Sequence, residues 1–293
     1  MVSENNQVEK RRIWHHRLCH RSINYIKSNL KWLSGTGLQS TDFVRGQLKE
    51  PCVCDACLRT KCVKLPRTVH SRNEKRSHAG EVSTDLYGPF PEPTVEGSFY
   101  LQVYVRVGSG HMVIYGCKRK NSCVENFNDY LRKWPPPLTS HYHSDGAPEL
   151  IGAEIQKLAD KFSPSIILTH SPAYSPNQNC YAERSLRTLA DMSHPNLVLS
   201  GLPFRFIEKC MIYSAQVHNM LPRQTDRGWM SPHEYEYGTL PDFSRLRRWG
   251  CLAYYHVPVQ LRRKGDIENG KKAFFMCLSV RDSLTAGYCG TRN

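Results

Sequence analysis

The sequence predicts an α/β protein in which helices cover a mixed sheet and a small metal-binding unit precedes it. Two observations predict this fold. From Glu81 onward, short runs rich in β-branched and aromatic residues are followed by segments with helical spacing, in the order β-β-β-α-β-α-β-α. Before them, a polar and basic segment to about Pro66 contains five of the cysteines and a histidine cluster.

Length, composition and charge indicate the broad class of protein. The 293 residues exceed the roughly 100–200 of a single core, so one large domain with a small companion is expected. Hydrophobic residues make up 40%, which excludes a disordered chain, and no apolar run approaches the roughly 20 residues of a membrane span. The net charge of +14 favours a polyanionic partner such as nucleic acid, against the alternative of a basic protein with no such partner.

Each predicted element follows from a local pattern. In the first segment, four apolar residues from Ile23 to Leu33 recur at helical spacing and predict one amphipathic helix. Strands are expected at 82–86, 99–107, 112–115, 140–143 and 166–168, with a hairpin turn at 108–110. Helices are expected at 124–134, where three prolines follow, at 151–162, at 182–189 and from Pro203 to about Met220, before a strand-like tail.

Histidines and cysteines of the first segment have the spacing of a structural zinc site. His15 and His20 precede the Cys-x-x-Cys pair formed by Cys54 and Cys57. Two imidazoles and two thiolates give the closed tetrahedral set that structural Zn²⁺ prefers, and a unit of about 60 residues needs such a staple. His16, Cys52 and Cys62 are alternative ligands, and solvated histidines with incidental reduced cysteines are the non-metal alternative. The N-terminus has no apolar signal region, so the 12 cysteines are expected to be reduced thiols or metal ligands.

Three acids stand at the ends of predicted elements. Asp85 ends the first strand, Asp145 follows the fourth, and Glu183 lies near the start of a helix. Three carboxylates at one sheet edge would hold two Mg²⁺ ions about 4 Å apart, an arrangement that activates a hydroxyl and stabilises the leaving oxygen of a phosphodiester. Taken singly, each acid is more often a turn residue or a helix cap.

The ordered motifs resemble one family. The chain is similar to the integrase of Ty1/copia-type retrotransposons through Trp14-His15-x-Arg17-Leu18-x-His20, Cys54-x-x-Cys57-x-x-x-Lys61, Thr84-Asp85-x-x-Gly88-Pro89, Ser144-Asp145-x-x-x-Glu149, Tyr174-Ser175-Pro176-x-Gln178-Asn179-x-x-Ala182-Glu183-Arg184, Ser231-Pro232-His233-Glu234, Gly238 and Leu246-Arg247-x-x-Gly250-Cys251-x-Ala253-Tyr254. The resemblance implies a zinc-binding pre-integrase domain at 1–66, an RNase H-like catalytic core at 75–242, and a partial C-terminal extension at 243–293. It implies a DDE triad of Asp85, Asp145 and Glu183 that binds Mg²⁺ or Mn²⁺.

The implied function is that of a DDE-type integrase, a polynucleotidyl transferase that joins element DNA ends to target DNA, as part of a Pol polyprotein. Expected partners are the element ends, the target duplex and further copies of the chain, in the nucleus and the cytoplasm. The alternative is a decayed or domesticated integrase that binds nucleic acid or a protein without catalysis. Gly146-Ala147-Pro148 stands where the family has Asn-Gly-Gly, and Cys180 where it has glycine, and both departures favour that alternative. Another DDE transposase or nuclease is less expected, because neither normally carries the histidine and cysteine prelude.

Arginines beside the third acid are candidates for DNA contact. Arg184 and Arg187 lie on the same predicted helix as Glu183 and would bind phosphates without reading sequence. The alternative is a surface pair of Glu183 with Arg187, worth about 0.3–0.5 kcal/mol. Three basic groups are each, taken singly, more typical of a solvated face, but together they could form a DNA-binding track: Lys118-Arg119-Lys120, Arg245 with Arg247 and Arg248, and Arg262-Arg263-Lys264.

Overall fold

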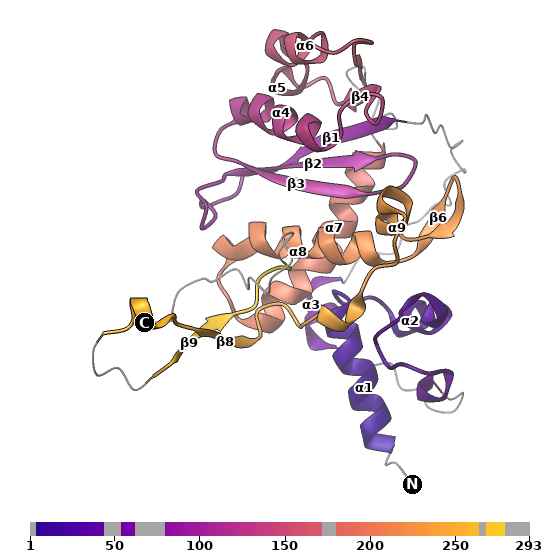
Figure 1. Ribbon diagram of the computed structural model, residues 1–293, viewed down its shortest axis with the longest axis vertical. Coiled ribbons are helices and arrows are strands. Elements are labelled where there is room, and N and C mark those ends of the chain that lie inside the picture. Colours follow the sequence, from indigo (N-terminus) through magenta and orange to yellow (C-terminus); the bar gives the residue numbers. More distant parts are fainter. Residues whose placement is uncertain (1–3, 44–53, 62–79, 172–179, 264–267, 279–293) are drawn as a thin grey trace. The chain divides into compact units, whose positions relative to one another are not determined.

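The computed structural model describes residues 4–43, 54–61, 80–171, 180–263 and 268–278 (Figure 1). The chain divides into two compact units, neither of them contiguous in sequence. One unit comprises residues 1–61, 192–217 and 242–293, and the other residues 62–191 and 218–241. The predicted boundary between residues 66 and 75 lies outside the described residues, and the three-domain division stays a prediction. None of the helices in the described ranges is long and apolar enough to cross a membrane.

A five-stranded mixed sheet forms the centre of the second unit. Its strands are β1 (Glu81–Tyr87), β2 (Tyr100–Arg106), β3 (Met112–Cys117), β4 (His141–Ser144) and β5 (Ile167–His170), in the order β3-β2-β1-β4-β5. β2 pairs antiparallel with β1 and β3, and β4 pairs parallel with β1 and β5. The predicted fold class, a mixed sheet flanked by helices, is confirmed.

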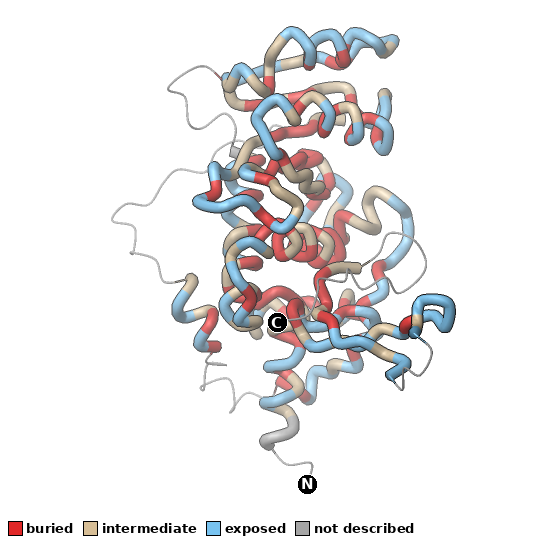
Figure 2. The backbone as a smooth tube through the Cα atoms, turned by 90° about the vertical axis from the view of Figure 1, so that its left-hand side faces the viewer, coloured by how far each residue is buried: buried red, intermediate tan, exposed pale blue. Residues whose placement is uncertain are grey.

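Helices cover one face of this sheet, as Figure 1 shows for α4 (Cys123–Lys133) and α6 (Ala153–Ala159). The ring of Tyr104 on β2 stacks on that of Tyr130 on α4, with 4.5 Å between the ring centres. The core beneath the helices is fully or almost fully buried: Val82, Tyr104, Phe127, Tyr130, Leu131, Trp134, Tyr142, Ile155, Leu158, Ala159 and Ile166. Buried and exposed residues alternate along the helices (Figure 2), because only one side of each helix meets the core.

Two local expectations differ from the structure. The helix expected at 151–162 is two short helices, α5 (Pro148–Ile151) and α6, because Gly152 between them has extended backbone with ψ at 164°. The amphipathic helix expected after the histidines ends early: α2 spans Ile23–Ser28, and a 3₁₀ turn at Leu30–Trp32 follows. In both places the apolar spacing predicts residues that are buried or half-buried, but not the break in the backbone.

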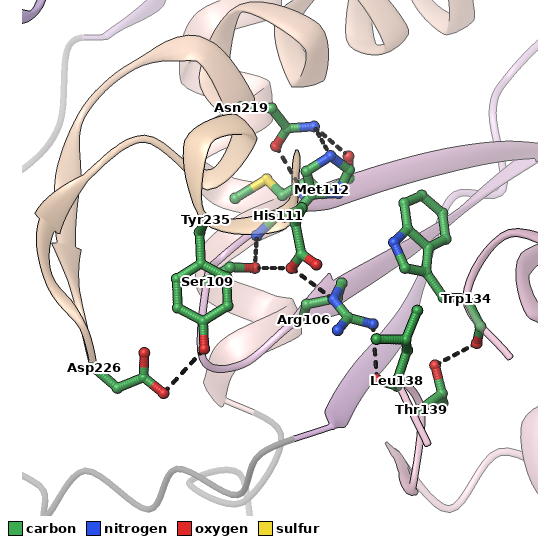
Figure 3. A network of polar contacts seen from close by, with 11 residues as sticks. Arg106, Ser109, His111, Met112, Trp134, Leu138, Thr139, Asn219, Asp226 and Tyr235 are labelled. Carbon is green, nitrogen blue, oxygen red and sulfur yellow. Dashed lines mark hydrogen bonds and ion pairs between the residues drawn. The ribbon is translucent and has the colours of Figure 1, made fainter. Parts of the chain in front are cut away.

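A polar network ties the segment 218–241 to the sheet (Figure 3). The Asn219 side chain accepts a hydrogen bond from Met112 N at 2.9 Å and donates to Met112 O at 2.8 Å, as a neighbouring strand would. Glu236 forms a buried ion pair with Arg106 at 2.7 Å and accepts from Ser109 Oγ at 2.6 Å. This segment contains the hairpin of β6 (Arg223–Thr225) and β7 (Gly228–Met230), and α9 (Pro232–Tyr237).

The first unit is mainly helical. α1 (Glu4–Arg17), which no apolar spacing predicts, precedes α2 and α3 (Asp55–Thr60). The unit also includes the later part of α7 (Cys180–Ser200) and most of α8 (Ile207–Met220), joined by a hydrogen bond of 2.9 Å between Ser193 Oγ and Ser214 Oγ. Its strand-like tail is an antiparallel pair, β8 (Leu252–His256) and β9 (Gly270–Phe274).

Candidate functional site

The four predicted zinc ligands come together in the first unit. His15 lies in the last turn of α1, and Cys54 and Cys57 lie at the start of α3. After α1 ends, Cys19 and His20 adopt positive φ angles of 51° and 59°, and His20 N donates to His15 O at 2.7 Å. This left-handed turn brings the His20 ring back toward His15, so that the donor atoms of His15, His20, Cys54 and Cys57 all lie within 4.8 Å of one another.

The spacing of these donor atoms fits a tetrahedral metal ion. His20 Nδ1 lies 3.2 Å from His15 Nε2, 3.3 Å from Cys54 Sγ and 3.2 Å from Cys57 Sγ. His15 Nε2 lies 3.3 Å from Cys57 Sγ. Ligands at about 2.0 Å for nitrogen and 2.3 Å for sulfur place tetrahedral donors about 3.3–3.8 Å apart. The donor set and its size therefore suit Zn²⁺.

Residues around the ligands fix their protonation. His15 Nδ1 donates to Arg21 O at 2.7 Å, which leaves the Nε2 lone pair facing the cluster. Burial lowers the pKa of His15, and burial with nearby positive charge lowers the pKa of His20 to about 2. Both rings are therefore neutral at pH 7, the form that binds metals.

The alternative ligands are less well placed or not described. His16 Nε2 lies 3.8 Å from Cys54 Sγ, outside the group of four. Cys52 and Cys62 lie outside the described residues. Lys61, which was not predicted as a site residue, supports the site: its Nζ donates to His20 O at 3.0 Å and holds the turn that carries His20. The sequence feature that points to Lys61 is its fixed spacing after the two cysteines, in the motif Cys54-x-x-Cys57-x-x-x-Lys61.

Asp85 lies in β1 of the second unit, and Asp145 directly follows β4, the parallel strand beside β1. The register pairs Glu81 with His141, Val82 with Tyr142 and Ser83 with His143. Extended by two residues beyond the last of these pairs, the same register would set Asp85 in β1 level with Asp145, just after β4. Glu183 lies in the first turn of α7 with an exposed side chain.

The charges of Asp145 and Glu183 act on Asp85. The pKa of Asp85 is raised to about 6, chiefly by burial and also by the charges of Asp145 and Glu183, against a hydrogen bond from Leu86 N that lowers it. Like charges at short range disfavour joint ionisation, and a divalent cation relieves that repulsion. A donor set made only of carboxylate oxygens suits Mg²⁺. The assignment of these residues as a catalytic triad stays a prediction.

Arg184 and Arg187 are exposed on α7. Among the ion pairs of the described residues, none includes Arg184 or Arg187, so the alternative surface pair of Glu183 with Arg187 does not form there. Residues 172–179, which carry most of the motif before Glu183, lie outside the described ranges, as does Lys264 of the third basic group.

Comparison with known proteins tests the resemblance to Ty1/copia-type integrases. The chain is 23% identical over 257 residues to a retrovirus-related Pol polyprotein from transposon TNT 1-94 of Nicotiana tabacum, covering 87% of the chain. It is 23% identical over 275 residues to the Pol polyprotein from transposon RE1 of Arabidopsis thaliana, covering 92% of the chain. Over nearly all of its length, the chain is similar to retrotransposon Pol polyproteins. This similarity agrees with the Ty1/copia resemblance, which is confirmed at the level of an integrase-like protein. The chain spans 18% of the length of each of these relatives.

No protein-family model matches the chain. Solved structures similar to it include the catalytic core domain of BIV integrase, with a TM-score of 0.39, 17% identity and coverage of 54% of this chain and 93% of that one. The HTLV-2 integrase catalytic core domain in complex with magnesium has a TM-score of 0.41, 15% identity and coverage of 55% and 98%. A simian T-cell lymphotropic virus intasome in complex with PP2A regulatory subunit B56 gamma has a TM-score of 0.45, 16% identity and coverage of 72% and 73%.

Proposed function

We propose that the chain is the integrase segment of a retrotransposon Pol polyprotein and joins element DNA ends to target DNA. Two findings support this proposal: the similarity to plant Pol polyproteins, and a histidine and cysteine cluster that precedes the mixed sheet in the order that the integrase resemblance implies. The observation that carries the catalytic part is the parallel register of β1 and β4, which sets Asp85 level with Asp145.

In this proposal Asp85, Asp145 and Glu183 hold Mg²⁺ or Mn²⁺ at the end of the sheet. The bound ions would supply Lewis-acid activation of a hydroxyl group and stabilisation of the leaving oxygen. The role of the protein is to fix the carboxylates: Asp85 is fixed within a strand, and Asp145 Oδ1 accepts from Ala147 N at 3.3 Å in the turn after β4. The pKa of Asp85 is raised, so its ionised form is disfavoured in the protein alone and would be stabilised by a nearby divalent cation.

DNA is the proposed substrate, and its backbone the main contact. The excess of 14 positive charges and the exposed Arg184 and Arg187 support binding that depends on phosphates rather than on base sequence. Zn²⁺ at His15, His20, Cys54 and Cys57 is proposed as a structural ion that stabilises the first unit. We further propose that the protein acts as a homo-oligomer, in the nucleus as well as the cytoplasm.

A strand-transfer assay tests the catalytic proposal. The chain is incubated with labelled oligonucleotide duplexes and Mg²⁺ or Mn²⁺, and joined products are resolved by electrophoresis. We expect joining by the natural chain and none by Asp145→Asn, which keeps the side-chain shape but removes a charge. Glu154→Gln, at an exposed position in α6, is the matched control and should join normally. Joining that survives in Asp145→Asn would refute the role of Asp145.

A second candidate function is nucleic-acid binding without catalysis. Ala147 and Pro148 directly after Asp145-Gly146, where the family has glycines, favour it, because they restrict the backbone of this turn. Unchanged DNA binding with no joining under either metal would select this candidate.

A further inference from the structure

Glu149, four residues after Asp145, makes an ion pair that the proposed chemistry does not use. Its Oε1 lies 2.5 Å from Lys120 Nζ, and its side chain is only 13% exposed. Burial alone would raise the pKa of Glu149, but the hydrogen bond and the charge of Lys120 lower it overall. Because a largely buried carboxylate is costly without a partner, Lys120 determines where Glu149 can lie.

Lys120 belongs to a different element, whose flanking residues are buried, although the Lys120 side chain itself is exposed. It begins a 3₁₀ turn, Lys120–Ser122, between β3 and α4. The residues at the two sides of this turn, Cys117 and Cys123, are fully buried in one cluster with Leu150. The ion pair therefore lies beside a cluster that joins the β3–α4 connection to the segment after Asp145.

The segment from Asp145 to Leu150 packs on this cluster through Ala147 and Leu150, and its own hydrogen bonds are local. Asp145 Oδ1 accepts from Ala147 N at 3.3 Å, and Ala147 O accepts from Leu150 N at 2.9 Å. These bonds are internal to the segment. Glu149 is its polar attachment to the β3–α4 connection, and Lys120 is close enough to Asp145 for the two charges to interact.

We propose that Lys120 is a positioning residue: by holding Glu149, it fixes the turn that presents the Asp145 carboxylate to a divalent cation. This inference rests on the proposed function of Asp145. The residue acts through Glu149 and the turn, and needs no contact of its own with the metal or with DNA.

Substituting Lys120 with an uncharged residue distinguishes a positioning role from a purely electrostatic effect on the cation. Lys120→Met removes a positive charge near Asp145, which by Coulomb attraction alone would tighten the binding of a cation. Loss of a fixed ligand turn instead weakens it, and residues that orient metal ligands typically change affinity by about 10–100-fold. The two roles thus predict changes of opposite sign.

The experiment measures Mn²⁺ dissociation constants by electron paramagnetic resonance on the zinc-loaded full chain. We expect about tenfold weaker binding in Lys120→Met, in Glu149→Gln and in the double variant, and near-normal binding in Lys120→Arg, which can restore the ion pair. Lys118→Met is the matched control, because Lys118 is exposed in the same basic group, and it should bind as the natural chain does.

Three results would overturn the inference. Tighter or unchanged binding in Lys120→Met contradicts positioning, and so does a double variant that returns to the natural affinity, because the two charges then simply cancel. Failure of Lys120→Arg to restore binding also contradicts it. If the natural chain binds no Mn²⁺, the proposed function fails together with the inference, whereas binding that ignores Lys120 overturns the inference alone.

Discussion

The ring of His15 is oriented by the backbone of Arg21: His15 Nδ1 lies 2.7 Å from Arg21 O, and Nε2 of the same ring faces Cys57 Sγ at 3.3 Å. Arg21 directly follows His20, so the turn that places one ligand also fixes the ring of another. A metal ion at this cluster would therefore hold the end of α1 to the start of α3.

The first prediction concerns the thiolates. Cys54→Ser should reduce zinc from one equivalent to near zero and lower the melting temperature of the chain, because three remaining ligands leave the metal poorly held and the unit without its staple. Zinc content by atomic absorption and thermal unfolding by circular dichroism measure this. Cys251→Ser, at a half-buried thiol outside the cluster, is the control. Equal zinc in Cys54→Ser and the natural chain would remove Cys54 from the ligand set.

The second prediction distinguishes the neighbouring histidines. His20→Ala should lose zinc and His16→Ala should keep it, because His20 Nδ1 lies 3.2–3.3 Å from three other donor atoms, whereas His16 approaches Cys54 Sγ at 3.8 Å. Competition with a chromophoric zinc chelator gives the affinities. The opposite ranking would show that His16 is the ligand.

The third prediction is a steep salt dependence of DNA binding. The logarithm of the association constant for a labelled duplex should fall linearly with the logarithm of salt concentration, and Arg184→Ala and Arg187→Ala should each reduce the slope by about 0.9. Fluorescence anisotropy at several salt concentrations measures this. Arg132→Ala is the control, since Arg132 is paired with Asp129 at 3.1 Å. A flat dependence would argue against phosphate contacts.

The fourth prediction concerns divalent cations and stability. Mg²⁺ should raise the melting temperature of the unit that holds the sheet, because it stabilises an Asp85 carboxylate whose pKa is raised by burial and by the repulsion of Asp145 and Glu183. Asp145→Asn should abolish this gain while zinc content stays unchanged, and Glu154→Gln should retain it. Differential scanning calorimetry with and without Mg²⁺ is the measurement. A full gain in Asp145→Asn would exclude that residue from the site.

The fifth prediction concerns pH and the first unit. Burial alone would raise the pKa of Asp42, but hydrogen bonds from Lys10 Nζ and Gln39 N, each 2.8 Å long, lower it overall. A lowered pKa contributes stability above the unfolded value near 3.8, which is lost as pH falls through the folded value. Asp42→Asn should therefore reduce stability at pH 7 and flatten its fall below pH 4 in urea unfolding curves. An unchanged acid limb would contradict this.

Much of the fold was predictable because burial imposes a period on the sequence. The runs around Val82, Tyr104 and Tyr142 have the composition of buried strands, and the structure places all three residues in one core. The order of strands and helices followed from these runs. By contrast α1 has polar residues on all sides, so no period revealed it, and the break at Gly152 depends on a backbone angle that hydrophobic spacing does not encode.

The sequence by itself determined which side chains are available as ligands: two histidines, two cysteines and three acids at the ends of predicted elements. Only the tertiary structure decided which atoms meet. The left-handed turn at Cys19 and His20 selects His20 over His16 for the group of four donors, and the pairing of β1 with β4 brings Asp85 level with Asp145. It also joined Lys120 to Glu149, a pair 29 positions apart in sequence. Such contacts depend on chain geometry and packing between distant segments, whereas local periodicity reports only whether a residue is buried.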